Sequence, residues 1–258
     1  TAEEAYSTQV ADTMYMRNDW VDTMYARILT SRLSRRSDYV YSDNDFILMG
    51  KIVEAVTGKK LDDYVKDSFY EPLGMKTTTF KPYHHFANDQ VAPTERENIF
   101  RNETIWGYVH DPGAAMFGNV AGHAGLFSNA GDLARLFQML LNGGVYEGKR
   151  YLQKSTIDKF TAYQTPISRR GLGFDKPEKD NAQRAPEKAY PARYVSPKTY
   201  GHTGFTGTCV WVDPEKELIY IFLSNRVNPT ADNPKLVQMN IRGRIQDLIY
   251  EAINKTPG

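Results

Sequence analysis

Cysteine is almost absent from this sequence. The 258 residues hold one, Cys209, so an internal disulfide is excluded and cysteine usage does not identify a redox compartment. Cys209 lies in an apolar run after the letters HTGFTGT, where we expect a buried, unreactive thiol. The sequence therefore gives no reason to look for a cysteine nucleophile.

The chain also lacks an excess of charge and a long hydrophobic run. Lys and Arg number 32 against 31 Asp and Glu, which gives a formal net charge of +1. No global field would attract nucleic acid or anionic lipid, so we predict neither as a partner. No apolar run approaches the length of a membrane span, and the first 20 residues have no basic-then-apolar leader pattern. We expect this N-terminus to be a mature or truncated end.

Several common catalytic motifs are missing as well. The sequence contains no G-x-S-x-G, no Walker loop, no G-x-G-x-x-G and no H-E-x-x-H, which disfavours nucleophile-elbow hydrolases, nucleotide-binding loops and zincins. His110, Asp111 and His123 could assemble a metal site, but their spacing matches no compact ligand motif. We favour ordinary loop or core histidines, and we predict no metal and no cofactor.

The sequence does contain several segments with the apolar spacing and end signals of helices. Apolar residues recur at helical spacing over roughly 8–29, 46–56, 61–69 and 133–140, and again in a closing segment defined by Val237, Ile241, Ile245, Leu248 and Ala252. Gly58 is placed to cap the second of these helices at its C-terminus. Residues 81–120 and 175–198 are rich in turn-forming residues, and we expect irregular excursions there.

One antiparallel hairpin is clear near the C-terminus. The letters TCVWV and ELIYIFLSN flank the turn DPEK, with proline at the second turn position. Alternating β and α units, which a parallel sheet would need, are absent. We therefore predict an α/β protein of the α+β type, with an antiparallel sheet flanked by helices and a mostly helical lobe.

Two short motifs remain, YSD at residues 41–43 and HTG at residues 202–204. YSD opens a predicted helix, whereas HTG opens a predicted strand in which glycines mark a bulge or a close approach of other atoms. Each motif alone is weak evidence. Tyr41 could simply pack at a helix entry, and His202 could face water at a strand edge.

The sequence around the two motifs favours a functional role for them over a purely structural one. From about Tyr41 to the C-terminus, the chain resembles the serine β-lactamase and penicillin-binding-protein superfamily, in its class C and esterase-like branch. The segments that carry the likeness are YSDNDFILMGKIVEAVTG, EPLGMKTTTF, GHAGLFSNAGDLARLFQMLLNGG and GHTGFTGTCVWVDPE, in family order. The region around His110, Asp111 and GHAGLF is most similar to members fused behind a cell-wall glycosidase. The resemblance implies one β-lactamase/transpeptidase-like domain over 1–258, truncated, with 30–200 approximating the helical lobe and its excursions and 200–258 the sheet hairpin and closing helix.

The resemblance assigns the first motif to a Tyr-x-Asn element. Ser42–Asp43–Asn44 could pose as the alternative Ser-x-Asn motif, but Phe46 stands five positions after Tyr41, as the Tyr-type branch requires. Tyr41 would then act as the proton shuttle between nucleophile and leaving group. Asp43 replaces the usual asparagine, and an ionised carboxylate cannot donate the hydrogen bond that an amide donates.

The resemblance assigns the second motif to the strand that lines the cleft. His202 stands where many relatives carry lysine, and it brings less positive charge at neutral pH. This change shifts the expected substrate from β-lactams toward esters or peptides. Thr203 would bind the substrate carboxylate or carbonyl, Gly204 would let the substrate lie against the backbone, and the backbone N–H of Phe205 would donate to the oxyanion.

The superfamily nucleophile, the serine of Ser-x-x-Lys, is missing. No serine in the sequence has lysine three residues later. Thr57–Lys60 and Thr156–Lys159 have the spacing but lie in the wrong part of the chain. We expect a C-terminal portion of a longer protein, with apolar surface left exposed and no acyl turnover on its own, because covalent catalysis needs an activated nucleophile.

Two functions remain open. One is a serine hydrolase acting on a β-lactam, a D-amino-acid peptide or an ester, with the missing N-terminal segment as its partner. The other is a non-catalytic module that binds cell-wall peptide. In both cases the resemblance implies a bacterial cell-envelope or periplasmic location.

Overall fold

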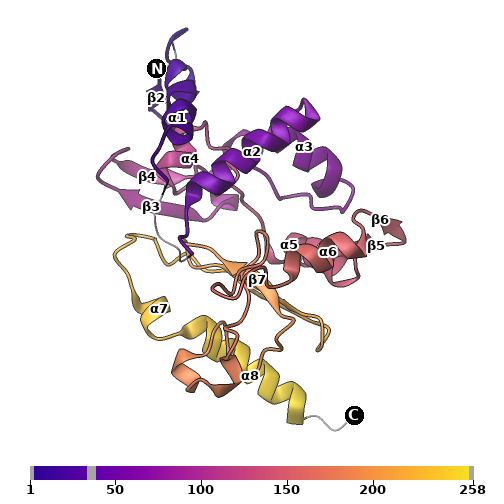
Figure 1. Cartoon of the computed structure of the whole chain (residues 1–258). Coiled ribbons are helices and arrows are strands. Elements are labelled where there is room, and N and C mark those ends of the chain that lie inside the picture. Colours follow the sequence, from indigo (N-terminus) through magenta and orange to yellow (C-terminus); the bar gives the residue numbers. More distant parts are fainter. Residues whose placement is uncertain (1–2, 34–38, 256–258) are drawn as a thin grey trace. The chain divides into compact units, whose positions relative to one another are not determined.

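The computed structural model describes residues 3–33 and 39–255 (Figure 1). The chain forms two compact units, Thr1–Asn129 with Val227–Ala231, and Ala130–Arg226 with Asp232–Gly258. The expectation of a single β-lactamase-like domain over 1–258, divided near residue 200, stays a prediction. Among the described helices, none is long and apolar enough to cross a membrane.

The first unit contains helices and two small antiparallel hairpins. Its elements are β1 (Thr8–Gln9), β2 (Tyr15–Met16), α1 (Asp19–Leu29), α2 (Asp43–Thr57), α3 (Leu61–Val65) with a π turn at Lys66–Tyr70, 3₁₀ turns at Pro82–His84 and Asn88–Gln90, β3 (Pro93–Glu97), β4 (Glu103–Trp106) and α4 (Pro112–Met116). Strand β1 pairs with β2, and β3 pairs with β4. A buried cluster of Val10, Val109 and three alanines forms part of the core of this unit.

Helix α2 follows the local signals of its sequence. Ser42 is the N-cap in an extended conformation, and its Oγ accepts a hydrogen bond from the backbone N–H of Asn44 at 3.2 Å. Gly58 ends the helix in the left-handed conformation at φ 69°, which confirms the predicted C-cap. Met49, Ile52 and Val56 are 50%, 50% and 81% exposed at helical spacing on α2.

The prediction of one long helix over residues 8–29 was wrong in its first half. Residues 8–16 form the β1–β2 hairpin, in which the Val10 N–H donates to the Met14 carbonyl at 2.9 Å. The Asn18 side chain holds the hairpin by accepting from the backbone N–H of Ser7 at 2.9 Å. These contacts outweigh the helical periodicity, so α1 begins only at Asp19. The region 81–120 likewise contains the β3–β4 hairpin, which its turn-rich sequence did not indicate.

The second unit is built on the predicted antiparallel sheet. The strand order is β7 (Tyr200–Thr203), β8 (Cys209–Asp213), β9 (Leu218–Phe222), so β7 is an edge strand. The Lys216 N–H donates to the Asp213 carbonyl at 3.2 Å, which closes the expected DPEK turn. The other elements are α5 (Ala130–Leu141), β5 (Val145–Tyr146), β6 (Lys149–Arg150), α6 (Lys154–Thr161), 3₁₀ turns at Asn181–Gln183 and Pro186–Lys188, α7 (Lys235–Gln238) and α8 (Ile241–Lys255).

Helices pack against this sheet, as predicted for the α+β class. All five residues of β8 are buried. Ile249 of α8 packs against Cys209, Trp211 and Tyr220, whereas α5 packs against β9. Cys209 is buried, and burial raises the pKa of its thiol to about 11, as expected for an unreactive cysteine.

Candidate functional site

The Tyr-Ser-Asp motif stands at the entry to α2, in the first unit. Tyr41 precedes the capping residue Ser42 and is 54% exposed. Asp43 is the first residue of the helix and is also exposed. The hydroxyl of Ser42 is engaged in capping, so the helix start itself uses the serine of this motif.

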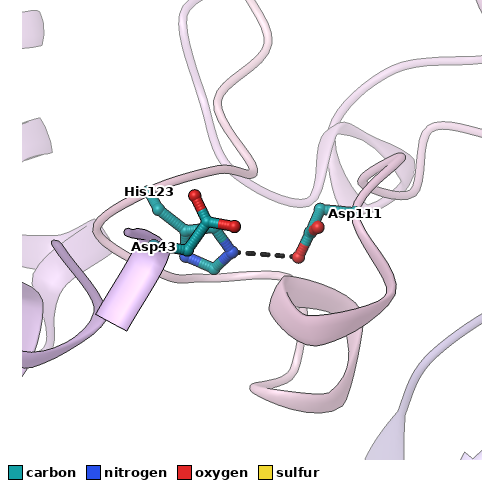
Figure 2. A group of neighbouring side chains, drawn as sticks. All are labelled: Asp43, Asp111 and His123. Carbon is teal, nitrogen blue, oxygen red and sulfur yellow. Dashed lines mark hydrogen bonds and ion pairs between the residues drawn. The ribbon is translucent and has the colours of Figure 1, made fainter. Parts of the chain in front are cut away.

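The Asp43 carboxylate lies near Asp111 and His123, which the sequence does not place together (Figure 2). One ligand-type atom from each residue lies within 4.8 Å of the other two. His123 Nε2 lies 2.9 Å from Asp111 Oδ1, and the same oxygen accepts from the Ala114 N–H at 2.7 Å as the N-cap of α4. Burial by itself raises the pKa of Asp111, but the hydrogen bonds from His123 and Ala114 outweigh it and leave that pKa below its ordinary value.

The sequence suggested a possible group of His110, Asp111 and His123. The structure keeps Asp111 and His123 together but places His110 elsewhere. His110 Nε2 instead pairs with Glu95 Oε2 at 2.7 Å, and Glu95 Oε1 also accepts from the Ala231 N–H. Asp43 takes the place of His110 in the cluster. Spacing could not reveal this, because Asp43 lies far before its two neighbours in the chain.

The His-Thr-Gly motif occupies the end of the edge strand β7, in the second unit. His202 pairs with Val210 of β8, and Thr203 pairs with Cys209. On the outer side of β7, Asp175 forms an isolated bridge with Gly201, with the Asp175 N–H donating to the Gly201 carbonyl at 2.7 Å. The outer edge of the strand is thus covered at Gly201.

The glycines of this segment are explained first by the protein's own atoms. A Cβ at Gly201 would lie 2.0 Å from the Val210 carbonyl oxygen, and one at Gly204 would lie 2.3 Å from Thr208 Oγ1. The Gly204 N–H donates to the Thr208 carbonyl at 2.8 Å, which turns the chain after β7. Close backbone approach within the sheet therefore requires glycine at Gly201 whatever else lies against the strand.

His202 has both ring nitrogens engaged. Nδ1 lies 2.8 Å from the Thr203 carbonyl oxygen, and Nε2 lies 2.8 Å from Arg170 Nη1. A carbonyl can only accept and a guanidinium can only donate, so Nδ1 carries the proton and Nε2 accepts. Burial lowers the pKa of His202, and the charge of Arg170 lowers it further, although the hydrogen bond to Thr203 opposes both. His202 is therefore a neutral imidazole at neutral pH.

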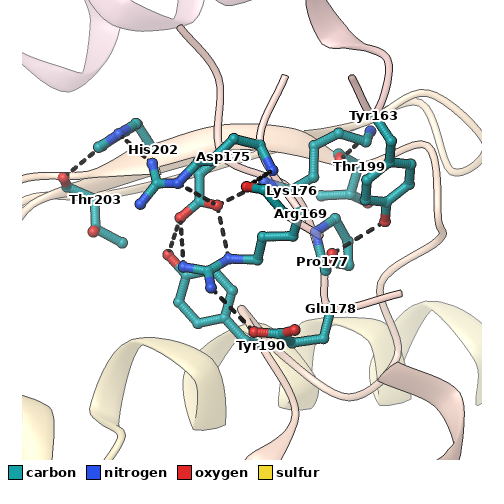
Figure 3. A network of polar contacts seen from close by, with 12 residues as sticks. Tyr163, Arg169, Asp175, Lys176, Pro177, Glu178, Tyr190, Thr199, His202 and Thr203 are labelled. Carbon is teal, nitrogen blue, oxygen red and sulfur yellow. Dashed lines mark hydrogen bonds and ion pairs between the residues drawn. The ribbon is translucent and has the colours of Figure 1, made fainter. Parts of the chain in front are cut away.

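Beside His202 lies a network centred on the buried carboxylate of Asp175 (Figure 3). Asp175 accepts from Arg169 Nε at 2.8 Å and from the Tyr190 hydroxyl at 2.7 Å, and its Oδ1 lies 3.3 Å from Arg170 Nε. Arg169 also stacks over the Tyr190 ring at 4.3 Å. The sequence analysis missed Arg169, Arg170 and Asp175, and the adjacent arginines in SRRGLGFD were the one available signal.

Phe205 follows the strand in a turn. Its side chain is 64% exposed, and the guanidinium of Arg226 lies over the ring at 4.4 Å. Arg226 Nε also donates to the Phe205 carbonyl at 2.7 Å, which orients the peptide around the residue proposed as oxyanion donor. The roles of Tyr41, Asp43, His202, Thr203, Gly204 and Phe205 stay predictions.

Comparison with known proteins agrees with the likeness of the sequence motifs. A family model described as Beta-lactamase matches residues 2–238. A relative from Escherichia coli K12 with the name "Putative D-alanyl-D-alanine carboxypeptidase" is 39% identical over 240 residues, covering 85% of this chain and 54% of the relative. A relative of the same name from Salmonella typhi is 39% identical over 212 residues, covering 78% of this chain and 48% of the relative. The chain thus spans about half the length of the curated relatives it matches.

Solved structures show the same fold at lower identity. A penicillin-binding protein homologue from Caulobacter crescentus superposes with a TM-score of 0.54 at 19% identity, covering 80% of this chain and 58% of that one. The octameric penicillin-binding protein homologue from Pyrococcus abyssi gives a TM-score of 0.54 at 20% identity, covering 84% of this chain and 44% of that one.

Proposed function

The chain belongs to the beta-lactamase family, and from this premise we propose that it carries the tyrosine and His-Thr-Gly parts of a serine acyl-transfer site that acts on peptides ending in a D-amino acid. The relatives named as D-alanyl-D-alanine carboxypeptidases support this substrate class. One observation carries the proposal, namely the guanidinium of Arg170 at hydrogen-bond distance from His202.

This guanidinium supplies the positive charge that His202 lacks. Arg170 is anchored by the Asp175 carboxylate, and its side chain is 19% exposed. A guanidinium beside the His-Thr-Gly strand suits a substrate carboxylate, because charge-assisted hydrogen bonds to carboxylates are short and strong. A carboxypeptidase substrate has such a terminal carboxylate, whereas a simple ester does not. Arg170 therefore favours peptides over esters, and it restores the carboxylate recognition that we expected His202 to weaken.

In the proposed reaction, Tyr41 passes a proton from the attacking serine to the leaving amine. The backbone N–H of Phe205 donates to the developing oxyanion, and Thr203 with Arg170 binds the carboxylate. The serine itself is not among these 258 residues in its family motif, so we expect an upstream segment of the same protein to supply it. On this proposal the chain by itself turns over no substrate, and the whole protein acts in the bacterial cell envelope.

The alternative is a module that binds cell-wall peptide without catalysis. The Arg170 and Thr203 region could hold a peptide carboxylate without any nucleophile. Tyr41 favours the enzyme, because a binding module has little use for a proton shuttle.

Covalent labelling separates the two. The 258-residue chain and a version extended upstream are treated with a fluorescent penicillin and a fluorophosphonate, and adducts are measured by intact mass. Labelling of the extended protein alone supports the enzyme, and the adduct locates its serine. Labelling of neither favours the binding module, and labelling of the short chain would show that the motif assignment is wrong.

The tyrosine has its own test in the extended protein. Tyr41→Phe should abolish acyl turnover and spare ligand binding, because the substitution removes the proton-carrying hydroxyl and keeps the ring. Turnover of a D-amino-acid peptide and binding of the same peptide measure the two effects. Undiminished turnover would remove Tyr41 from the mechanism.

A further inference from the structure

The cluster of Asp43, Asp111 and His123 has the composition of a metal site (Figure 2). Its members come from three segments of the first unit: the start of α2, the N-cap of α4 and the loop that follows α4. An imidazole with two carboxylates is a ligand set that suits zinc, which commonly takes three protein ligands and leaves a fourth position open.

Two of the three ligands are already fixed. Asp111 is held by capping α4, and His123 lies 2.9 Å from it through Nε2. Two ligands of a tetrahedral zinc ion are separated by about 3.3 Å, given bond lengths of about 2.0–2.1 Å. The observed pair would need to open by only a few tenths of an ångström to admit an ion.

The third ligand, Asp43, is not fixed in this way. Asp43 is exposed, and among the described residues no hydrogen bond or ion pair holds its carboxylate. It stands within 4.8 Å of the other two ligand atoms, so a change of rotamer could bring it onto a shared ion. Its exposure also provides the route by which an ion would enter from solvent.

His123 is held in the cluster through one of its two ring nitrogens. The side chain is 7% exposed, and its buried Nδ1 has no hydrogen-bond partner among the described residues. Buried polar atoms are normally paired, because an unpaired one costs free energy. The ring is therefore oriented through Nε2, the nitrogen that lies against Asp111.

The negative charge of the cluster also favours a bound cation. Two carboxylates stand at one imidazole, and no lysine or arginine side chain forms an ion pair with either carboxylate in the described part of the chain. A divalent cation would balance this negative charge.

We propose that Asp43, Asp111 and His123 bind one divalent transition-metal ion of the zinc type. The proposal is independent of the acyl-transfer function, because it concerns three side chains of the first unit and is tested without turnover.

The test is zinc binding to the chelator-treated 258-residue chain, measured by isothermal titration and by metal analysis after dialysis. We expect one zinc per chain and a higher melting temperature with zinc. Asp43→Asn and Asp111→Asn should each raise the Kd about tenfold or more. Asp111→Asn preserves the α4 cap, since asparagine caps as well as aspartate, so the metal-free melting temperature of this variant should stay near that of the parent.

Matched controls address adventitious binding. His84 and His85 are adjacent exposed residues that could capture zinc on the surface, and His110 belongs to the Glu95 pair. The double variant His84→Ala/His85→Ala and the single variant His110→Gln should each bind zinc as the parent does. Cobalt in place of zinc should show the intense visible bands of a tetrahedral site, and these should disappear in Asp43→Asn. Absence of stoichiometric binding, or binding kept in Asp43→Asn and lost in the double variant, would overturn the proposal.

Discussion

His202 is neutral because burial disfavours its charged form and Arg170 stands beside its accepting nitrogen. The positive charge of this motif therefore sits on a residue 32 positions earlier in the chain. The exchange matters chemically, since a guanidinium remains charged at every pH of interest and offers a planar fork of donors.

Arg170→Gln tests this assignment in the extended protein. We expect the KM for a peptide with a free C-terminal carboxylate to rise about tenfold to hundredfold, because a charge-assisted hydrogen bond contributes about 1.5–3 kcal/mol. The C-terminal amide of the same peptide should be almost unaffected. Lys198→Gln removes the same charge from an exposed pair with Glu215 and serves as the control. Equal losses for the acid and the amide would contradict a role in carboxylate recognition.

The buried Lys176 side chain should make the stability of the protein depend on pH. It is 2% exposed, its Nζ donates to the Thr199 carbonyl at 3.0 Å, and burial lowers its pKa to about 8, with Asp213 opposing the shift. Between about pH 8 and 10.5 the unfolded chain therefore binds more protons than the folded one, so this residue makes stability rise with pH in that window. Below pH 8 both states are protonated, and the buried charge costs about 3 kcal/mol.

Lys176→Met should remove that cost. Allowing about 1–1.5 kcal/mol for the lost hydrogen bond, we expect the variant to be about 1–2 kcal/mol more stable than the parent at about pH 7. The difference should shrink and then reverse as the pH approaches about 10. Urea unfolding of both proteins at about pH 7 and about pH 9.5 measures it, and a difference that does not change with pH would contradict the argument.

Among the elements of the second unit, strand β7 is constrained on both of its sides. On the outer side of β7, Asp175 forms a β-bridge with Gly201. On the inner side, the Val210 carbonyl of β8 lies so close that only glycine fits at Gly201. Gly201→Ala should lower the free energy of unfolding by about 3 kcal/mol or more, because the new methyl group overlaps the Val210 carbonyl.

Gly148→Ala is the matched control for this substitution. Gly148 has φ 76°, and no atom lies within 4 Å of the place that an added methyl group would take, so only backbone strain applies there. That strain costs about 1–2 kcal/mol. Denaturant melts of the two variants should differ accordingly, and equal losses would mean that the β7–β8 spacing relaxes.

For helix α8, the sequence predicted the position of the helix correctly but predicted the wrong buried face. The helix forms where apolar spacing predicts it, but Val237 lies in the separate helix α7, and Ile245 and Leu248 are 37% and 63% exposed. The buried positions include Gln246 and Tyr250 instead. The Tyr250 hydroxyl donates to the buried Asp213 carboxylate at 2.7 Å, and this polar contact with β8 helps to set the rotation of the helix.

At the scale of the whole molecule, near-zero net charge coincides with exposed apolar side chains. The sequence pI is about 7.7, and Met49, Ile52 and Val56 form an exposed stripe on α2. Proteins without net charge lack the repulsion that opposes association, and apolar stripes promote it.

We therefore expect concentration-dependent self-association near pH 7.7, measured by sedimentation velocity. Val56→Lys should reduce it by interrupting the stripe. Ile99→Lys adds the same charge at a residue outside the stripe that is 95% exposed, and it should have a smaller effect. Equal effects of the two substitutions would show that net charge alone is responsible.

Features that depend on near neighbours were predictable from the sequence alone. Helix α2 between Ser42 and Gly58, the β8–β9 hairpin and the existence of α8 all follow from caps, turns and periodicity within about 20 residues. The family likeness also came from sequence, because its motifs lie in a fixed order.

Contacts between side chains that are distant in sequence could be found only in the folded chain. Arg170 beside His202, Asp43 near His123 and the buried face of α8 depend on contacts between residues far apart in the chain. The hairpin at residues 8–16 also needed such information, because the Asn18 side chain that holds it bonds to a residue eleven positions earlier, and no helical or strand periodicity encodes that contact. Local patterns encode hydrogen bonds along the chain, whereas charge pairing and packing between segments are fixed only when those segments fold together.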